Sequence, residues 1–521
     1  MTIKSASPEK AGIKSQNILD FHTKIKKKKL SLHSAVLYKD GAILSEVYYA
    51  PFKAEDNHRM FSIAKSAVAI AVGLMEGEGL ISTCDPIIKY FPEKRPVHPY
   101  IEQMTIGDML MMRTCHAQTT YDKFDLGSDW VDSFFTKTPT HKPGSVFHYD
   151  TSAPFVLSAL CERLTGKKTW DYVRDSLKGL NLSKTSHFIS GGMGVSHGGS
   201  GLVSTTLDIL KLGIFFLNEG NIDGEQIISK DYMRRAVSDL TPNCVASPLP
   251  SESCGYGYYV WRTEKNGYVL YGMGGQLVIV CPEEKMILVT TADTQGYSGG
   301  NQIIYDAFYE CILDPYRQSL KDTAVSKNTN AKNNLNEQSS EKAAMALREF
   351  EKTARLSSLT EEIPGCILPG SSEFESFIRK YDRASYSFYP AEADSKDKDI
   401  AACESSINAK APLSRLYLSL DESKGAKLTF VYADSSEYDL PFGYSKNIEG
   451  SLPLYGNRTF TSAALIAKDT LYIRARVCDE ILGSIHMELY FEDDSLTLYM
   501  KKIEETSFKE FNAHLTGNRL S

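Results

Sequence analysis

In Met60-Phe-Ser-Ile-Ala-Lys-Ser-Ala-Val-Ala-Ile-Ala-Val-Gly-Leu-Met75, a serine and a lysine three residues apart stand at the start of an apolar run. From Ala67 to Met75 the run is apolar on all sides, which is typical of a helix buried inside a domain. Ser62 and Lys65 stand at positions i and i+3, so they are neighbours on one face near the start of the predicted helix. The run therefore predicts a buried helix that begins with a hydroxyl and an amine side by side.

Strand patterns flank this helix on both sides in the sequence. Residues 34–49 predict two strands around an Asp40-Gly41 turn. Three more strand-like runs follow one another near residue 280, at 267–272, 277–281 and 286–291. Strands at both ends of a helical middle predict an α/β (α+β) domain, with an antiparallel sheet and a helical subdomain.

The second half of the chain has a different character. Residues 321–342 are polar, Asn-rich and almost without large apolar side chains, which predicts a linker or a long exposed loop. Strand-like runs follow at 416–420, 426–432, 470–477, 484–491 and 495–500. We therefore predict a catalytic domain at 1–320, a polar linker at 321–345 and a β-rich accessory domain at 346–521. The accessory domain is expected to end with a helix from Thr506 to Leu515, with Thr506 as its N-cap.

Composition excludes several classes of function. The chain has 521 residues, 42% of them hydrophobic, with a formal net charge of -7, so no overall basic field indicates nucleic acid or an anionic membrane. Its ten cysteines form no CxxC pair, and no Cys/His cluster has the spacing of a zinc site. The N-terminus has no apolar stretch typical of a signal peptide, and 18 apolar residues never run together. We expect a cytoplasmic protein that acts on a small molecule; a homo-oligomer is left open.

The Ser62 and Lys65 pair has the chemistry of an activated nucleophile. Burial lowers the pKa of a lysine from its reference value near 10.4, and a neutral lysine can take the serine proton. The pattern Ser-x-x-Lys alone is weak evidence, because it occurs four times, at Ser7, Ser62, Ser339 and Ser395. Only Ser62 opens an apolar helix, and the alternative there is an ordinary N-cap serine.

Further segments carry a resemblance to a known family. They are residues 7–12 and 51–52, Met60 to Ser66, Thr105 to Met112, Lys142 to Tyr149, Gly201 to Asp208 and Gly272 to Gln276. In these segments the chain resembles the family of class C β-lactamases, penicillin-binding proteins, family VIII esterases and 6-aminohexanoate-dimer hydrolases. The resemblance covers nearly all of residues 7–310 and none of the C-terminal domain. It implies a β-lactamase/transpeptidase-like catalytic domain that needs no metal and no organic cofactor.

The resemblance also implies roles for residues outside the helix. Tyr149, in Phe147-His-Tyr-Asp-Thr151, matches the family's catalytic tyrosine and is the implied general base or proton shuttle. Gly274 and Gly275 match a glycine motif that lets a strand edge approach the ligand. The backbone N–H groups of Ser62 and Gln276 would form the oxyanion hole. Without the resemblance, Tyr149 would read as a core tyrosine and the glycines as a turn.

Two positions depart from the family pattern. Thr151 stands where the lactamases keep an asparagine, and a hydroxyl is a shorter partner with a single donor. Met273 replaces the cationic or aromatic first residue of the third motif, so it cannot bind a carboxylate electrostatically. Both departures disfavour penicillins and D-alanyl peptides, and favour an apolar or uncharged acyl group. His116 and His197 lack the spacing of a metal site and an identifiable triad acid, so we expect them to be structural or substrate-facing.

The sequence therefore predicts a serine hydrolase that forms an acyl-enzyme on Ser62, with Lys65 and Tyr149 as proton-transfer groups. The predicted substrate is a small ester or amide, and an ester is preferred because a poorer leaving group demands better proton delivery than Thr151 supports. A D,D-peptidase or β-lactamase would share Ser62 and Lys65 and is one alternative. A non-catalytic binding or scaffold protein is the second.

Overall fold

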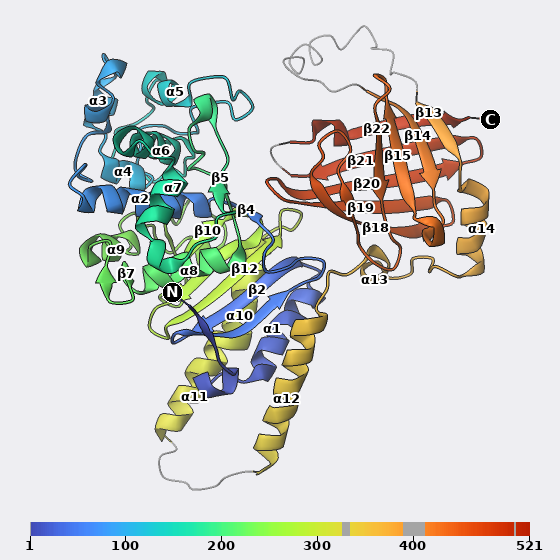
Figure 1. Cartoon of the computed structure of the whole chain (residues 1–521), viewed down its shortest axis with the longest axis horizontal. Coiled ribbons are helices and arrows are strands. Elements are labelled where there is room, and N and C mark those ends of the chain that lie inside the picture. The colour runs from blue at the N-terminus through green and yellow to red at the C-terminus, as the bar shows by residue number, and fades with distance from the viewer. Residues whose placement is uncertain (1, 326–333, 389–411, 505–506, 521) are drawn as a thin grey trace. The chain divides into compact units, whose positions relative to one another are not determined.

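A computed structural model describes residues 2–325, 334–388, 412–504 and 507–520 (Figure 1). The chain divides into two compact units, Met1–Arg355 and Leu356–Ser521. Among the described residues, every helix is too short or too polar to cross a membrane.

The first unit is built on a seven-stranded sheet. Its strands are, in spatial order, β1 (Lys4–Ser5), β3 (Ala42–Tyr48), β2 (Ser31–Lys39), β12 (Met286–Asp293), β11 (Gln276–Cys281), β10 (Tyr268–Gly272) and β9 (Trp261–Arg262). The short β1 runs parallel to β3, and the other neighbouring strands are antiparallel. Strand β2, near the N-terminus, pairs with β12, near the end of the domain, which confirms the predicted antiparallel sheet made of both ends of the domain.

The turn between β2 and β3 has the backbone that its sequence predicts. Asp40 has a φ of 48° and Gly41 a φ of 88°. Two consecutive residues with positive φ are the requirement of a type I′ hairpin turn, which explains the Asp-Gly pair. The predicted hairpin at residues 34–49 is confirmed.

Helices pack on this sheet and bury it. Helix α8 (Thr206–Leu217) lies against β11 and β12, where a Cβ added to Gly213 would be 2.5 Å from Val278. Helices α1 (Ser15–Lys27) and α10 (Gly300–Phe308) contact each other. Every residue of β12 is buried, as expected for a strand covered on both faces.

The helical subdomain surrounds the helix that the sequence singled out. Helix α2 (Ile63–Gly77) packs against α6 (Ser152–Thr165) and α7 (Thr169–Ser176), and all of its residues from Ile63 to Met75 are buried. A small sheet of β4 (His58–Phe61), β6 (Leu202–Ser204) and β5 (His187–Phe188) leads into it. The predicted buried helix is confirmed.

The second unit is a ten-stranded antiparallel near-barrel. Its strands are, in spatial order, β16 (Glu437–Pro441), β15 (Lys427–Tyr432), β14 (Leu413–Ser419), β13 (Ser385–Phe388), β22 (Ala513–Arg519), β21 (Ser495–Ile503), β20 (Leu482–Glu492), β19 (Thr470–Cys478), β18 (Arg458–Ala467) and β17 (Ile448–Ser451). Burial alternates along strands such as β15, whose Leu428, Phe430 and Tyr432 face the core. The five strand runs predicted from the sequence are confirmed.

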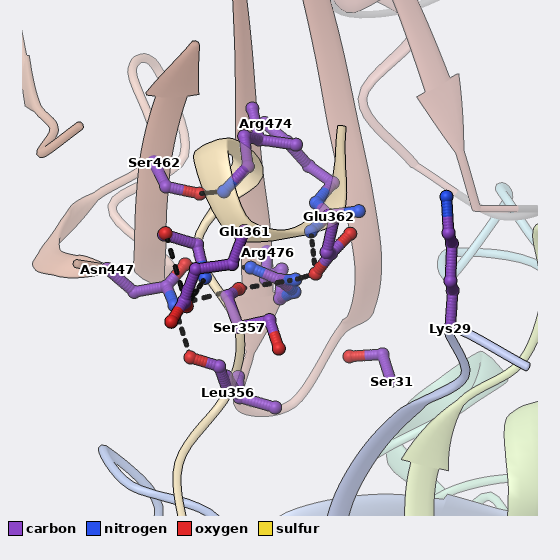
Figure 2. A network of polar contacts seen from close by, with 12 residues as sticks. Lys29, Ser31, Leu356, Ser357, Glu361, Glu362, Asn447, Ser462, Arg474 and Arg476 are labelled. Atoms are coloured by element: carbon purple, nitrogen blue, oxygen red, sulfur yellow. Dashed lines mark hydrogen bonds and ion pairs between the residues drawn. The ribbon is translucent and has the colours of Figure 1, made fainter. Parts of the chain in front are cut away.

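An ion-pair network joins the start of this unit to its sheet (Figure 2). Glu362, the last residue of α13 (Leu359–Glu362), accepts from Arg474 at 2.7 Å and from Arg476 at 2.9 Å. Arg476 is 3% exposed and also donates to the side chain of Asn447 at 2.7 Å. Two guanidinium groups of β19 therefore share one carboxylate.

The end of the chain differs from its prediction. Thr506 lies outside the described residues, and residues 507–520 contain a 3-10 turn at Lys509–Phe511 and strand β22 rather than a helix over 506–515. The helix prediction is wrong because β22 pairs with both β21 and β13. Local sequence does not reveal that this gap in the sheet needs a strand.

The polar segment predicted as a linker is bordered by helices. Helix α11 (Asp314–Val325) and helix α12 (Asn334–Thr353) enter residues 321–345 from either side, and 326–333 lie outside the described residues. Helix α12 packs on α1 and β3, with Leu347 buried and Phe350 against the ring of His22. The boundary between the units therefore falls at 355/356 rather than at 345/346.

Candidate active site

Ser62 lies at the junction of β4 and α2. Phe61, just before it, has a φ of 45°, in the left-handed region that a bulky residue rarely adopts. Such a conformation costs about 1–3 kcal/mol and persists only where the surrounding structure imposes it. The Ser62 side chain makes no N-cap hydrogen bond. The alternative of an ordinary capping serine is therefore not what the structure shows.

Lys65 directs its amine at this hydroxyl. Its Nζ lies 3.0 Å from Ser62 Oγ and donates to the carbonyl oxygen of Gly199 at 2.6 Å. The side chain is 1% exposed, and burial lowers the pKa of Lys65 to about 7, partly opposed by the negative charge of Asp150. A substantial fraction of Lys65 is therefore neutral near pH 7 and able to accept a proton.

Tyr149 is the third residue of the group that Ser62 and Lys65 form. Lys65 Nζ lies 4.7 Å from the centre of the Tyr149 ring, and the Tyr149 hydroxyl interacts with the Ser62 hydroxyl. Burial raises the pKa of Tyr149 above its usual value, while the contacts with Ser62 and Trp261 lower it. The rings of Tyr149 and Trp261 are 5.2 Å apart and fix the phenol in place. Tyr149 is thus a phenol at neutral pH, suited to pass a proton rather than to hold a charge.

Asp150 belongs to this group, and sequence reasoning missed it. Its carboxylate is 1% exposed and accepts from the backbone N–H groups of Ser152 and Ala153 at 2.8 and 3.1 Å, at the start of α6. Its charge raises the pKa of Lys65. The signal was present, because an aspartate just before a helix is a capping pattern. The pattern did not indicate that the charge of this carboxylate acts on a lysine of another helix.

The glycine segment lies next to the strand that leads to Ser62. A Cβ added to Gly272 would be only 2.3 Å from the carbonyl oxygen of Met60. Gly274 and Gly275 have φ values of 77° and 87°, which favour glycine. Thr290 Oγ1 donates to the Gly275 carbonyl at 2.8 Å and fixes the turn. The structure therefore brings the third predicted segment beside the first.

The Gln276 side chain is engaged inside the sheet. Its Nε2 donates to the carbonyl oxygens of Met273 and Ala292 at 3.1 and 2.7 Å, and its Oε1 accepts from the Ala292 N–H at 3.1 Å. Gln276 is fully buried, while Met273 is half-buried. The side chain thus clamps the turn to β12, and only the backbone of Gln276 is left for the predicted oxyanion hole.

Thr151 lies next to Gly199, the residue whose carbonyl oxygen accepts from Lys65. A Cβ added to Gly199 would be 2.4 Å from Thr151 Cγ2, and Gly199 supplies the carbonyl that accepts from Lys65. The Thr151 N–H donates to Thr119 Oγ1 at 3.4 Å. Thr151 therefore borders the lysine pocket through the Gly199 backbone.

The two histidines are buried and lie against aromatic rings. His197 packs against the rings of Tyr121 and Trp130, and burial lowers its pKa to about 3. His116 Nε2 lies 3.0 Å from the carbonyl oxygen of Phe134, and burial lowers the pKa of His116 as well. Both are neutral at pH 7. Within the described ranges, no group of three or more His, Cys, Asp or Glu side chains is arranged to hold a metal ion.

The chain is similar to several known proteins. The chain is 20% identical over 276 residues to the 6-aminohexanoate-dimer hydrolase of Paenarthrobacter ureafaciens, which covers 49% of this chain and 70% of the relative. A solved octameric penicillin-binding protein homologue from Pyrococcus abyssi is 15% identical and covers 96% of this chain and 99% of its own, with a TM-score of 0.45. The solved hydrolase EstCE1 is 15% identical and covers 57% and 99%, with a TM-score of 0.47.

A family model shows the membership of the chain directly. The model described as Beta-lactamase matches residues 28–306, more than half of the 521 residues. The match takes in the segments of Ser62, Tyr149 and Gly274, and it ends before the ten-stranded unit. The β-lactamase/transpeptidase-like α/β fold predicted from the sequence is thereby confirmed, and the protein belongs to the Beta-lactamase family.

Proposed function

We propose that this protein is a serine hydrolase that cleaves a small ester or amide through an acyl-enzyme on Ser62. One observation carries the proposal: the Ser62 hydroxyl lies 3.0 Å from a fully buried amine whose pKa is about 7. A serine beside a neutral base is an activated nucleophile. The strained turn at Phe61 and the absence of a capping bond from Ser62 are further support.

The proposed reaction has two halves. In the first, Ser62 Oγ attacks the substrate carbonyl carbon, and its proton passes to neutral Lys65 or through the Tyr149 phenol. The tetrahedral oxyanion would be held by the N–H groups of Ser62 and Gln276. The leaving group receives a proton from Lys65 through Tyr149 and departs. In the second half, a water attacks the acyl carbon as its proton passes to the same groups. That proton then passes to Ser62 Oγ as the bond between Oγ and the acyl carbon breaks, which releases the acid and free Ser62.

The groups around Ser62 favour an uncharged acyl chain. By the sequence resemblance, Met273 corresponds to the cationic or aromatic first residue of the family's third motif, and a methionine, half-buried here, cannot bind a carboxylate electrostatically. Thr151 offers one hydroxyl instead of an amide. We therefore prefer an ester with an apolar acyl group. An amide is the second candidate, since a curated relative is named a 6-aminohexanoate-dimer hydrolase.

Two experiments test the proposal. Hydrolysis of p-nitrophenyl esters with a series of short acyl chains should exceed that of a Ser62→Ala control. Mass spectrometry after treatment with a fluorophosphonate should find the adduct on Ser62. Failure of both measurements with every ester would overturn the proposal and favour the binding or scaffold alternative. Labelling of Ser62 by a fluorescent penicillin, in place of ester turnover, would favour a D,D-peptidase or β-lactamase.

A further inference from the structure

Trp261 is a buried aromatic neighbour of Tyr149. It lies on the two-residue strand β9 and is 5% exposed, and its ring is 5.2 Å from the ring of Tyr149, with 39° between the ring planes. At this close packing its indole N–H contacts the Tyr149 hydroxyl. A buried indole N–H usually has a hydrogen-bond partner. The Tyr149 oxygen is the partner that the geometry offers to Trp261.

Two kinds of contact hold the Trp261 ring in place. In the sheet, Trp261 pairs with Val269 of β10, which fixes its backbone. Around the ring, the aromatic rings of Phe147, Tyr256 and Tyr271 lie 5.8, 5.1 and 5.5 Å away. Packing on several sides leaves a bulky ring few alternative positions. The indole is therefore held rigidly.

The chemistry of the indole decides what this contact can do. An indole N–H donates a hydrogen bond and cannot accept one. The Tyr149 oxygen therefore accepts from Trp261, and the phenol proton points away from the indole, where the same oxygen meets Ser62. A phenol that gives its proton to a leaving group carries part of a negative charge while the proton moves. A fixed N–H aimed at that oxygen stabilises the developing charge.

We propose that Trp261 is a positioning residue of the site: its buried N–H directs the Tyr149 proton toward the reacting groups and stabilises the phenol oxygen while that proton moves to the leaving group. The inference deepens the proposed function and rests on it, because it assumes that Tyr149 delivers a proton during acylation. The leaving-group oxygen gains the phenol proton as its bond to the acyl carbon breaks. The phenol then regains a proton from Lys65, which took it from Ser62.

The test compares kcat/KM for two esters of one acid, phenyl butyrate and p-nitrophenyl butyrate. They share the acyl group and nearly the same shape, but phenol is the poorer leaving group and depends more on proton delivery. Trp261→Phe keeps a buried ring and removes the N–H. Thermal unfolding checks that each variant is folded. Should Trp261→Phe fail to fold, β-(3-benzothienyl)alanine at position 261 keeps the shape of tryptophan and replaces the N–H with sulfur.

Tyr256→Phe is the matched control. The Tyr256 ring lies in the same aromatic cluster, 5.1 Å from that of Trp261, and its buried hydroxyl has no hydrogen-bond partner among the described residues. The substitution therefore changes the cluster without removing a contact to Tyr149 of the kind that Trp261 makes. It should leave the ratio of the two kcat/KM values as in the wild type.

The expected result is a loss that depends on the leaving group. Trp261→Phe should lower kcat/KM about three- to tenfold for phenyl butyrate and less than about twofold for p-nitrophenyl butyrate. In a Tyr149→Phe background the same substitution should not change the ratio of the two values further, because its effect passes through the phenol.

Two results would overturn the inference. One is an equal loss with both esters, which would indicate that Trp261 acts through packing alone. The other is a change of the ratio by Trp261→Phe in the Tyr149→Phe background. Absence of hydrolysis of both esters by the wild-type protein would instead overturn the proposed function, and the role of Trp261 with it.

Discussion

Lys65 Nζ lies 3.0 Å from Ser62 Oγ while the side chain that carries it is 1% exposed. Sequence spacing alone makes such a contact available, since residues i and i+3 are neighbours on a helix. Burial allows the Lys65 amine to accept a proton from Ser62, because it lowers the pKa of the amine to about 7. Each of the following predictions depends on a distance between two groups or on the burial of a side chain.

Replacing Ser62 with alanine should remove hydrolysis without unfolding the protein. The side chain makes no capping hydrogen bond, so its loss costs the helix little. Loss of a nucleophile lowers kcat by about 10³-fold or more. Ester turnover and thermal unfolding measure the two effects. A Ser62→Ala variant that retains wild-type turnover would place the nucleophile elsewhere; Ser66→Ala, on the same helix, is the control for folding, since Ser66 Oγ donates to the Tyr259 carbonyl at 2.9 Å.

The rate should rise with pH through the ionisation of Lys65. Lys65 accepts a proton only when neutral, so kcat/KM should increase about tenfold per pH unit below about pH 7 and level off above it. Lys65→Arg cannot deprotonate in this range and should lose both the activity and the rise. A pH profile of ester hydrolysis from about pH 5 to about pH 9 measures the effect. A profile that is flat across this range would contradict the role of Lys65 as a base.

Removing the charge of Asp150 should move that profile to lower pH. The carboxylate raises the pKa of Lys65, so Asp150→Asn should lower it further and leave more of the lysine neutral in mildly acidic solution. Asparagine retains an oxygen that accepts from the N–H groups at the start of α6. The midpoint of the acid limb, compared with that of the wild type, measures the effect. A shift toward higher pH would show that the carboxylate does not act on Lys65.

A methyl group at Gly272 should disturb the packing of β10 against the β4 segment that leads to Ser62. The added Cβ would be 2.3 Å from the Met60 carbonyl oxygen, which belongs to the backbone and cannot rotate away. Gly272→Ala should therefore push β10 away from β4, cost about 1–3 kcal/mol of stability and lower ester turnover. Gly77→Ala is the matched control, because an added Cβ there meets no atom within 4 Å. It should leave stability unchanged or improve it slightly. Equal stability and turnover of the two variants would contradict this packing.

Removing the carboxylate of Glu362 should weaken the second unit. Without it, Arg474 and the buried Arg476 lose a shared partner, which costs about 3–5 kcal/mol for a buried pair. All three tryptophans lie in the first unit, so a loss seen by far-ultraviolet circular dichroism and not by tryptophan fluorescence would locate the effect in the second.

Glu449→Ala is the control for this prediction. Glu449 pairs with Arg458 at the surface, at 2.7 Å, and its side chain is 58% exposed, so its loss should cost about 0–1 kcal/mol. A Glu362→Ala protein as stable as Glu449→Ala would show that the shared carboxylate does not hold the guanidinium groups in place.

Elements whose signals lie within a few neighbouring residues could be predicted from the sequence. An apolar run predicted α2, an Asp-Gly pair predicted the turn at Asp40 and Gly41, and alternating strands predicted much of the second unit. Ser62 and Lys65 were predicted because they are three residues apart on one helix, and Tyr149 and Gly274 because they stand in segments that resemble a family. Each of these inferences uses neighbours in the chain or a pattern already known.

Tertiary structure alone decided which side chains from distant segments meet. The charge of Asp150 acts on Lys65, and Gly272 packs against the backbone of Met60, across gaps of tens of residues or more that no periodicity spans. The last residues form β22 because β21 and β13 need a strand between them, and that hydrogen-bonding demand lies outside the local sequence. The pKa of Lys65 likewise depends on how much water the packed protein excludes. Local chemistry therefore identified the nucleophile, and long-range packing determined the electrostatic surroundings in which it lies.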